Sequence, residues 1–209
     1  MRTRSEEKRR EIIDAAAGLF AEQGYERTSM SAISERVGGS KATLYGYFES
    51  KEELLRAVLA DSVAQITERL LHEFTEDDLR DGLIRIGEHY LMDRLAPLPI
   101  MQLRTVATQP EETRFGADYY AQVLRPAWER FSQRLEGLIA QGRLSGADPW
   151  TMAMHWKGLT EGELFEKRLL GAMTVPDAEE VRSAAILAAD AFLKLYGNSP
   201  TARPAKTEV

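Results

Sequence analysis

The segment from Gly24 to Leu55 constrains the fold of this chain more than any other stretch. Within about thirty residues it contains a helix end, two short helices, a glycine turn and the start of a further helix. Gly38-Gly39 is expected to turn the chain, because residues without a Cβ adopt positive φ at little cost. Long helical patterns fill the rest of the sequence, so this short block predicts a helix-turn-helix.

The expected helices follow from apolar periodicity and from cap residues. Apolar side chains recur at helical spacing from Ile12 to Phe20. Ser40 provides an N-cap oxygen for a short helix, and Ser50-x-x-Glu53 forms a capping box that opens the next one. The predicted helices lie at about residues 6–23, 29–37, 41–48, 51–70, 79–95, 100–107, 113–141, 149–170 and 177–196.

This pattern predicts an all-α fold of about nine helices, in which an N-terminal three-helix helix-turn-helix head is joined to a helical body. The expected division is a head at residues 1–56, a body at 57–197, and a disordered tail at 198–209 that has no apolar side chains to bury. Pro126 lies inside the seventh helix, so a kink or two separate helices are expected there.

The charge distribution permits contact with nucleic acid although the net charge is -6. Residues 1–56 hold ten Lys/Arg and ten Asp/Glu, so the acidic excess belongs entirely to the body. The first ten residues carry five basic and two acidic side chains. Local sign governs phosphate contact more than the total charge does.

Several function classes find no support in the sequence. There is no cysteine, and the three histidines show no metal-ligand spacing, so no metal or other cofactor is expected. No nucleophile or acid–base pair is grouped with an orienting partner, so no catalytic residue is predicted. No apolar run approaches the roughly 18 residues of a membrane span, and none resembles a signal peptide. We expect a soluble cytoplasmic protein that is not an enzyme.

The helix expected at residues 41–48 has two different faces. Leu44 and Phe48 are spaced to pack inward on the preceding helix. The opposite face carries hydrogen-bonding or charged side chains, and the small Ala42 and Gly46 allow the backbone to approach a groove. A recognition helix places such a face in the major groove of DNA. A helical hairpin with a polar surface is the alternative interpretation.

These residues resemble the TetR family of transcriptional repressors. The resemblance covers about residues 8–60 and rests on Ile12-Ile13-Asp-Ala-Ala16, Leu19-Phe20, Gly24-Tyr25, Thr28-Ser-Met30, Ile33, Ser40-Lys-Ala-Thr-Leu-Tyr45, Tyr47-Phe48, Ser50-Lys-Glu52 and Leu54. Two positions depart from the family pattern. Gly39 replaces a usual apolar residue, which is expected to loosen the turn, and Ser34 replaces a usual Ala, which adds a hydroxyl.

The resemblance implies that the head binds a double-stranded DNA operator. Lys and Thr side chains suit base edges, and hydroxyls suit phosphate oxygens. The implied DNA contacts are Thr28, Ser29, Ser31, Ser40, Lys41, Ala42, Thr43, Tyr45, Tyr47 and Lys51.

The last two helices, at about 149–170 and 177–196, are the predicted homodimer interface. A single head reads only one half-site, and the family resemblance implies a four-helix bundle formed with the symmetry mate. The run from Ser183 to Ala191 is rich in small residues, so it allows helices to approach closely. A seam inside one chain is the alternative use of the same residues.

The middle helices combine aromatic and methionine side chains with polar groups. Such stripes suit either a plain core or a pocket for a small, largely apolar effector, which the resemblance implies releases the DNA. A DNA-binding protein of the same fold without an effector, with a structural or activator role, is the second hypothesis. The predicted ligand contacts are His89, Met92, Met101, Arg104, Phe115, Tyr119, Trp128 and His155.

Overall fold

The computed structural model describes residues 4–72, 78–146 and 148–198, and it confirms the all-α fold. In these ranges there is no β-strand, only an isolated bridge between Leu144 and Gly197. The elements are α1 (Arg4–Gln23), α2 (Met30–Arg36), α3 (Lys41–Tyr47), α4 (Lys51–His72), α5 (Leu79–Arg94), α6 (Pro97–Ala107), η1 (Glu111–Thr113), α7 (Phe115–Tyr119), η2 (Tyr120–Leu124), α8 (Arg125–Ala140), α9 (Pro149–Leu170) and α10 (Ala178–Tyr196).

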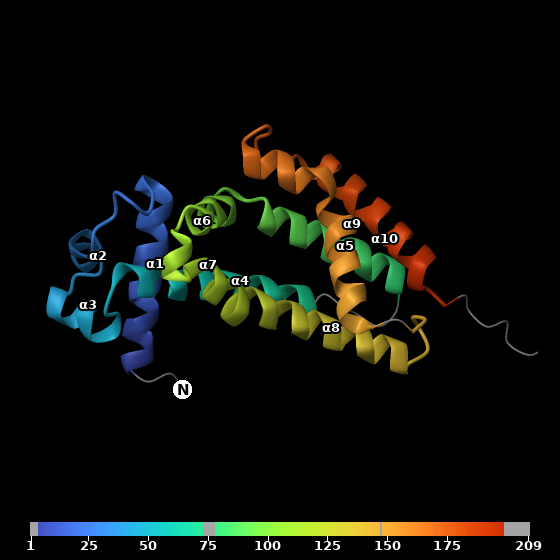
Figure 1. The fold of residues 1–209 in the computed structure, drawn as a ribbon, viewed down its shortest axis with the longest axis horizontal. Coiled ribbons are helices and arrows are strands. Elements are labelled where there is room, and N and C mark those ends of the chain that lie inside the picture. Colours follow the sequence, from blue (N-terminus) through green and yellow to red (C-terminus); the bar gives the residue numbers. More distant parts are fainter. Residues whose placement is uncertain (1–3, 73–77, 147, 199–209) are drawn as a thin grey trace, which may run out of the picture.

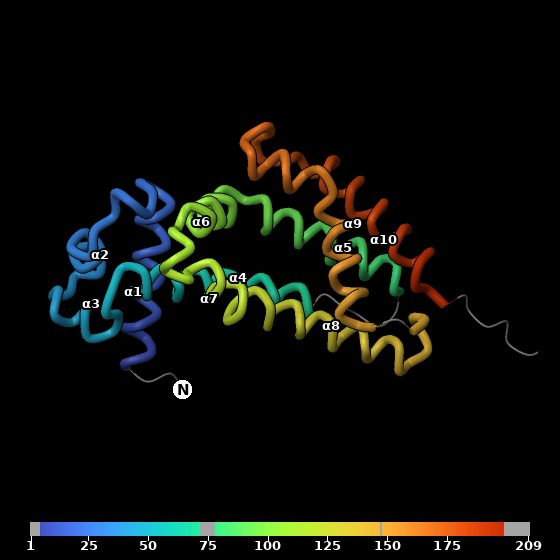
Figure 2. The backbone as a smooth tube through the Cα atoms, in the orientation of Figure 1, coloured from blue at the N-terminus to red at the C-terminus, as the bar shows by residue number. Residues whose placement is uncertain are grey.

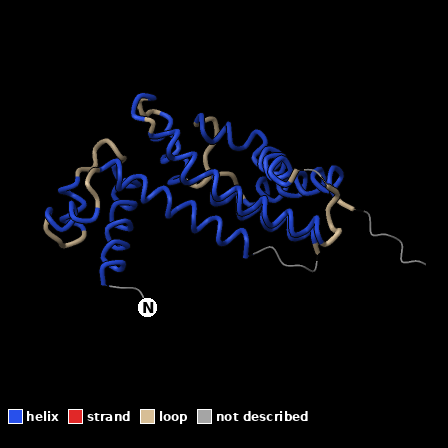
Figure 3. The backbone as a smooth tube through the Cα atoms, turned by 60° about the horizontal axis from the view of Figure 1, so that its bottom comes forward, coloured by secondary structure: helices blue, strands red, loops and turns tan. Residues whose placement is uncertain are grey.

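The helices form an elongated molecule with a small head at one end (Figure 1). Helices α1 to α3 make up this head, and α4 runs from it into the body beside α8. Helices α6 and α7 lie where the head meets the body, whereas α5, α9 and α10 lie toward the far end (Figure 2). Loops occupy only short connections between the helices (Figure 3). None of the helices within the described ranges combines the length and the apolar content that a membrane span requires.

The head forms for the local reasons that its sequence indicates. The Ser29 hydroxyl oxygen accepts a hydrogen bond from the Ala32 amide at 3.1 Å, and so begins α2. Ser40 begins α3 in the same way. Leu44 and Phe48 are buried in one cluster with the apolar side chains of α1 and α4, which confirms the predicted inward face of α3.

The core of the head continues into the body. Val106 of α6 and both Phe115 and Tyr119 of α7 belong to the same buried cluster as the apolar residues of α1 to α4. The Arg56 guanidinium of α4 lies 5.4 Å from the centroid of the Phe115 ring of α7. The predicted boundary at residue 56 therefore falls inside a continuous helix, and the division into two domains stays a prediction.

Prolines explain two differences between expected and observed helices. Helix α6 begins at Pro97, earlier than the expected residue 100. Amide hydrogens in the first turn of a helix have no acceptor within the helix, so Pro97 and Pro99 lose no helical hydrogen bond there. The long helix expected at 113–141 is interrupted by the π-helical η2, which directly precedes α8 and its second residue Pro126. This interruption confirms the irregularity expected at Pro126, since proline cannot donate the helical hydrogen bond.

Helix α9 contains a break that the sequence pattern did not predict. Gly162 has φ 45° and ψ -138°, a conformation outside the helical region that only glycine adopts readily. The preceding residue, Glu161, is buried with 6% of its surface exposed. The single helix expected at 149–170 is thus two helical pieces joined at Gly162.

Helix α10 packs closely on α5 within the chain. A Cβ atom placed on Gly87 of α5 would lie 3.0 Å from the Cβ of Ala185, so these two backbones approach as closely as small residues allow. Ala188, Ala189 and Phe192 are buried on the same side of α10. The small-residue run therefore forms an intramolecular seam, and only the other face of α10 is available to a partner. The predicted tail lies outside the described residues, apart from Asn198.

The two glycines of the head turn are predicted to respond oppositely to alanine. Gly38 has φ 67°, where a Cβ is strained, whereas Gly39 lies outside the left-handed region and has open space around it. Gly39→Ala should raise the free energy of unfolding by about 0.4–1 kcal/mol, because it restricts the unfolded chain. Gly38→Ala should lower it by about 1 kcal/mol.

Thermal unfolding of both variants measures this difference, since about 1 kcal/mol corresponds to a change in Tm of roughly 2–4 °C for a chain of this size. A loss of stability in Gly39→Ala equal to that in Gly38→Ala would contradict the assignment.

Candidate functional site

The exposed face of α3 presents the side chains that the sequence singled out. Lys41, Ala42 and Thr43 are exposed, Tyr45 is 49% exposed, and Tyr47 is half-buried. Because Leu44 and Phe48 anchor the opposite side of the helix, Lys41, Thr43 and Tyr45 face away from the core of the head, whereas Tyr47 packs partly against that core. This face can present the Lys41 ammonium group and the hydroxyls of Thr43 and Tyr45 to a binding partner. The small side chain of Ala42 lets the backbone of α3 come close to that partner.

Hydrogen bonds within the head organise several of the predicted hydroxyls. Ser40 Oγ accepts from the Thr43 amide at 3.0 Å and lies 2.9 Å from Thr43 Oγ1. Ser29 is exposed at the start of α2, and Ser31 is half-buried on its first turn. Cap oxygens keep a free lone pair, so they can still accept a hydrogen bond from a partner.

Two predicted contacts have structural roles in the chain. Thr28 is only 2% exposed, and its hydroxyl donates to the Gly24 carbonyl at 2.8 Å. Its side chain therefore supports the turn after α1 and does not fit a contact through the hydroxyl. Lys51 Nζ donates to the Tyr25 carbonyl at 3.0 Å and lies 4.1 Å from the centroid of the Tyr25 ring. Lys51 thus ties the start of α4 to the same turn.

The two residues that depart from the family pattern contact each other. Ser34 is buried, and its hydroxyl donates to the Gly39 carbonyl at 2.8 Å. Gly39 lines a small void of about 10 Å³ together with Ile12, Val37 and Leu44. The loosening expected at Gly39 stays a prediction, and the Ser34 hydroxyl bridges the turn.

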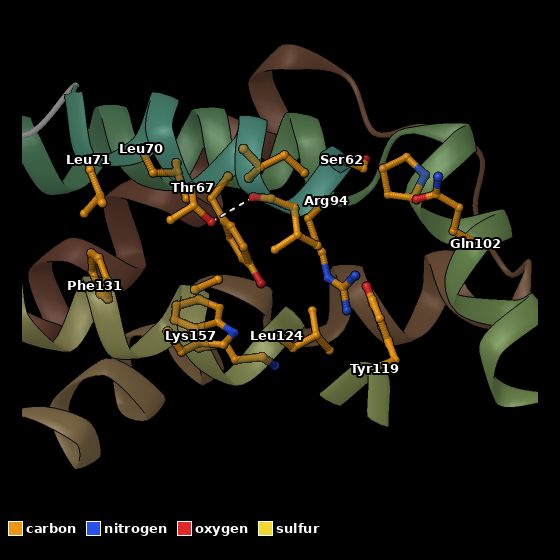
Figure 4. Close-up of a pocket in the computed structure, with 16 residues that line it drawn as sticks. Ser62, Thr67, Leu70, Leu71, Arg94, Gln102, Tyr119, Leu124, Phe131 and Lys157 are labelled. Atoms are coloured by element: carbon orange, nitrogen blue, oxygen red, sulfur yellow. Dashed lines mark hydrogen bonds between the residues drawn. The ribbon is translucent and has the colours of Figure 1, made fainter. Parts of the chain in front are cut away.

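A larger cavity of about 90 Å³ lies in the body (Figure 4). This volume is several times the roughly 10–15 Å³ that one water molecule requires. Helix α4 forms one wall, α5 and α6 a second, and α7, η2 and α8 a third, with one residue from α9. The lining residues are Ser62, Val63, Ile66, Thr67, Leu70, Leu71, Tyr90, Arg94, Pro99, Gln102, Tyr119, Leu124, Ala127, Trp128, Phe131 and Lys157.

A buried carboxylate organises the polar wall of this cavity. Glu161 accepts a hydrogen bond from the Tyr90 hydroxyl at 2.6 Å and from Lys157 Nζ at 2.5 Å. Arg94 Nε lies 3.6 Å from the same carboxylate. Burial raises the pKa of Tyr90 well above its ordinary value, and the adjacent carboxylate acts in the same direction. Tyr90 therefore stays a hydrogen-bond donor at neutral pH.

Aromatic side chains form the opposite, apolar wall. The ring centroids of Tyr90 and Trp128 are 5.6 Å apart, and those of Trp128 and Phe131 are 5.9 Å apart. Trp156 packs behind Phe131 at 4.9 Å and is buried. Such edge-to-face pairs hold the rings in defined positions, so this wall is a formed surface against which an apolar group can pack.

The structure brings two of the eight predicted ligand contacts to the cavity, Tyr119 and Trp128. Phe115 lies instead in the core of the head, and Met92 is 46% exposed on α5. Arg104 is exposed and donates to the carbonyls of Arg168 and Leu169, while His155 is exposed beside Tyr196. His89 and Met101 are half-buried outside the lining residues. These six residues do not line this cavity, because polarity along a helix does not reveal which neighbouring helix each face meets.

Sequence reasoning missed the polar residues that do line the cavity. Tyr90 and Arg94 are four residues apart on α5, and Lys157 and Glu161 are four apart on α9. This i, i+4 spacing places each pair on one helix face and was a usable signal. Gln102 stands in a mostly apolar helix, where its amide offered a second signal.

Comparison with known proteins assigns both parts of the chain. Residues 12–58 match the model of bacterial regulatory proteins of the tetR family. Residues 81–198 match the model of the C-terminal domain of AefR-like transcriptional repressors. These two matches cover the face of α3 and most of the helices around the cavity.

Individual proteins resemble the chain over most of its length. The helix-turn-helix transcriptional regulator YfiR of Bacillus subtilis is 27% identical over 169 residues, which cover 75% of this chain and 78% of YfiR. A solved structure of a TetR-family chain from Mesorhizobium loti has a TM-score of 0.85 at 23% identity and covers 94% of this chain and 100% of its own. The flavonoid-responsive regulator FrrA has a TM-score of 0.64 at 28% identity, covering 94% of this chain and 100% of its own. The two family matches together span both the helix-turn-helix and the helical body, and the chain therefore belongs to the TetR family of bacterial regulatory proteins.

Proposed function

We propose that this protein is a ligand-responsive transcriptional repressor. It binds a palindromic operator as a homodimer and leaves the DNA when a small, largely apolar molecule occupies the cavity in its body. The observation that carries this proposal is the place of Tyr119, which lines the cavity and also belongs to the buried core of the head. Tyr119 thus belongs both to the proposed effector site and to the buried cluster of the helices that support α3.

The exposed face of α3 supports the DNA-binding half of the proposal. Lys41 and Thr43 stand at its N-terminal end, the end that a recognition helix directs toward base edges. Tyr45 and Tyr47 stand one turn later, where hydroxyls suit phosphate oxygens. With Thr28 set aside and Lys51 partly engaged by the turn, the proposed DNA contacts are Ser29, Ser31, Ser40, Lys41, Ala42, Thr43, Tyr45 and Tyr47.

The outer faces of α9 and α10 support the homodimer. Leu159 is 36% exposed, Leu187 68% and Leu195 59%, although each lies on a helix whose other face is well packed. Exposed apolar side chains on adjacent helices favour burial against a partner. Two heads would then lie about 34 Å apart, or a multiple of that distance, on one palindrome.

Helix α4 supports the coupling between cavity and head. Its 22 residues begin beside the turn that Lys51 ties down and continue to the cavity wall at Leu70 and Leu71. An effector that prefers one orientation of α4 and α7 shifts the spacing of the two heads by its differential affinity for the two states. FrrA is described as flavonoid-responsive, and this chain shares its fold and 28% of its sequence, which favours a response to a small molecule here too.

Tyr47→Ala is predicted to weaken operator binding without unfolding the protein. DNA fragments selected by the purified protein supply the operator, and a mobility-shift assay measures the affinity. Each lost hydrogen bond to phosphate should cost up to about tenfold, and both half-sites are affected in a dimer. Tyr47→Phe removes only the hydroxyl and tests the hydrogen bond alone.

The matched control is Tyr120→Ala, because Tyr120 is 47% exposed but lies outside the head. Circular dichroism and thermal unfolding establish that each variant is folded. Wild-type affinity in a folded Tyr47→Ala variant would remove Tyr47 from the proposed contacts.

Leu187→Glu is predicted to convert the dimer to a monomer, because it places a charge at the centre of the exposed apolar face of α10. Sedimentation at micromolar concentration should show a dimer for the unmodified protein and a monomer for this variant. Met92→Glu is the control, since Met92 is also exposed but lies on α5. A dimer that survives Leu187→Glu would place the interface elsewhere.

A further inference from the structure

The charged side chains that line the cavity all have the same sign. Arg94 and Lys157 are the charged residues among the lining set that the described chain defines, and no Asp or Glu belongs to it. Glu161 is the carboxylate that contacts both cations, from outside the lining. Two positive charges are therefore compensated by one negative charge at this wall.

Glu161 lies closer to Tyr90 and Lys157 than to Arg94. The Tyr90 hydroxyl and Lys157 Nζ lie within 2.6 Å of its two oxygens, whereas Arg94 Nε is 3.6 Å away, which is too long for a hydrogen bond. The Arg94 guanidinium also lies 4.7 Å from the centroid of the Phe165 ring, and its side chain is only 16% exposed. A guanidinium held in this way retains N–H groups for a planar anionic partner.

A second polar group at the same wall lacks a partner. Gln102 is 5% exposed, and its Nε2 atom has no hydrogen-bond partner in the described chain. An unsatisfied buried amide is costly, so this group gains from a hydrogen-bond acceptor, which a water molecule or a bound ligand in the cavity can supply. Figure 4 shows the Tyr119 hydroxyl next to the Arg94 guanidinium, with Gln102 farther from it. Arg94, Gln102 and Tyr119 thus bring polar groups from α5, α6 and α7 to the lining of this cavity.

The remainder of the cavity is apolar. Trp128 and Phe131 form its aromatic wall, and Ile66, Leu70 and Leu71 of α4 face them. A ligand that satisfied only the donors would leave this surface empty, and a purely apolar ligand would leave Gln102 Nε2 without a hydrogen-bond partner. The two ends of the cavity therefore match a molecule with one acidic head group and one apolar body.

We propose that the effector is an amphipathic organic carboxylate. Its carboxylate accepts hydrogen bonds from Arg94 and Gln102, with the Tyr119 hydroxyl as a further donor, and its apolar body packs between Trp128, Phe131 and α4. This inference rests on the proposed effector function of the cavity and adds the chemical class of the effector. Tyr119 also belongs to the core of the helix-turn-helix head. The carboxylate of the ligand therefore binds where the cavity meets that part of the protein.

The test compares probes that differ only in the charge of the head group. Octanoate, octan-1-ol and octylamine form one series, and 2-naphthoate, 2-naphthalenemethanol and 2-naphthylmethylamine form the other. Isothermal titration of the full chain at neutral pH measures each Kd, and Trp128 fluorescence reports binding in the cavity. The acid in at least one series should bind about tenfold or more tightly than its alcohol, because a hydrogen bond to a charged group is worth more than a neutral one.

Two variants remove the proposed head-group donors. Arg94→Gln should weaken binding of the acid about tenfold to hundredfold and leave the alcohol unchanged. Gln102→Leu should weaken the acid about tenfold and at the same time raise the Tm of the ligand-free protein, because it removes an unpaired buried amide. The matched control is Arg130→Gln on α8, since Arg130 forms an ion pair with Glu68 on the surface and does not line the cavity. Gln102→Leu keeps the inference testable if Arg94→Gln does not fold.

The outcomes separate this inference from the proposed function. Acids that bind through Arg94 and Gln102 and also release the selected operator support both. Acids that bind in this way without affecting DNA support the carboxylate site and contradict the effector function. Alcohols or amines that bind as tightly as the acids, or acids that do not bind, overturn the carboxylate assignment, and release of DNA by those other probes would leave the effector function standing.

Discussion

The structure depends on one shared apolar core at the junction of head and body. Phe115 and Tyr119 of α7 are buried together with the side chains of α1 and α4, so the head does not have a closed core of its own. Protein interiors are close-packed, and a displaced side chain moves its neighbours instead of entering free space. Tyr119 also lines the cavity, so this one buried cluster borders both the cavity and the helices that hold α3.

Burial of Glu161 is the second constraint, and this residue lies next to the break in α9. An ionised carboxylate in the interior is tolerated only when donors surround it, and Tyr90, Lys157 and Arg94 meet this need from two helices. The next residue, Gly162, breaks the helix with a conformation that other residues adopt at a cost. The same arrangement leaves more positive than negative charge at the cavity wall, which makes the wall suitable for an anion.

Features that depend on contacts between residues close in the sequence were predicted correctly. Features that depend on contacts between distant segments were predicted only in part. The cap at Ser40, the inward face of α3 and the irregularity near Pro126 all follow from contacts within a few residues, and all are present. Tyr119 and Trp128 were predicted for the cavity, but Arg94 and Gln102 were not. Cavity residues come from six α-helices and from η2, and their arrangement depends on packing angles, which the spacing along one helix does not contain.

The sequence by itself determined the helical fold, the helix-turn-helix and the side chains that α3 exposes, because periodicity, capping and glycine turns act locally. Only the tertiary structure decided that Thr28 is buried and that the Tyr90 hydroxyl donates a hydrogen bond to Glu161. It also decided which polar groups share one cavity wall. The physical reason is that burial and charge compensation arise between segments far apart in the chain, and these become neighbours only when the helices pack.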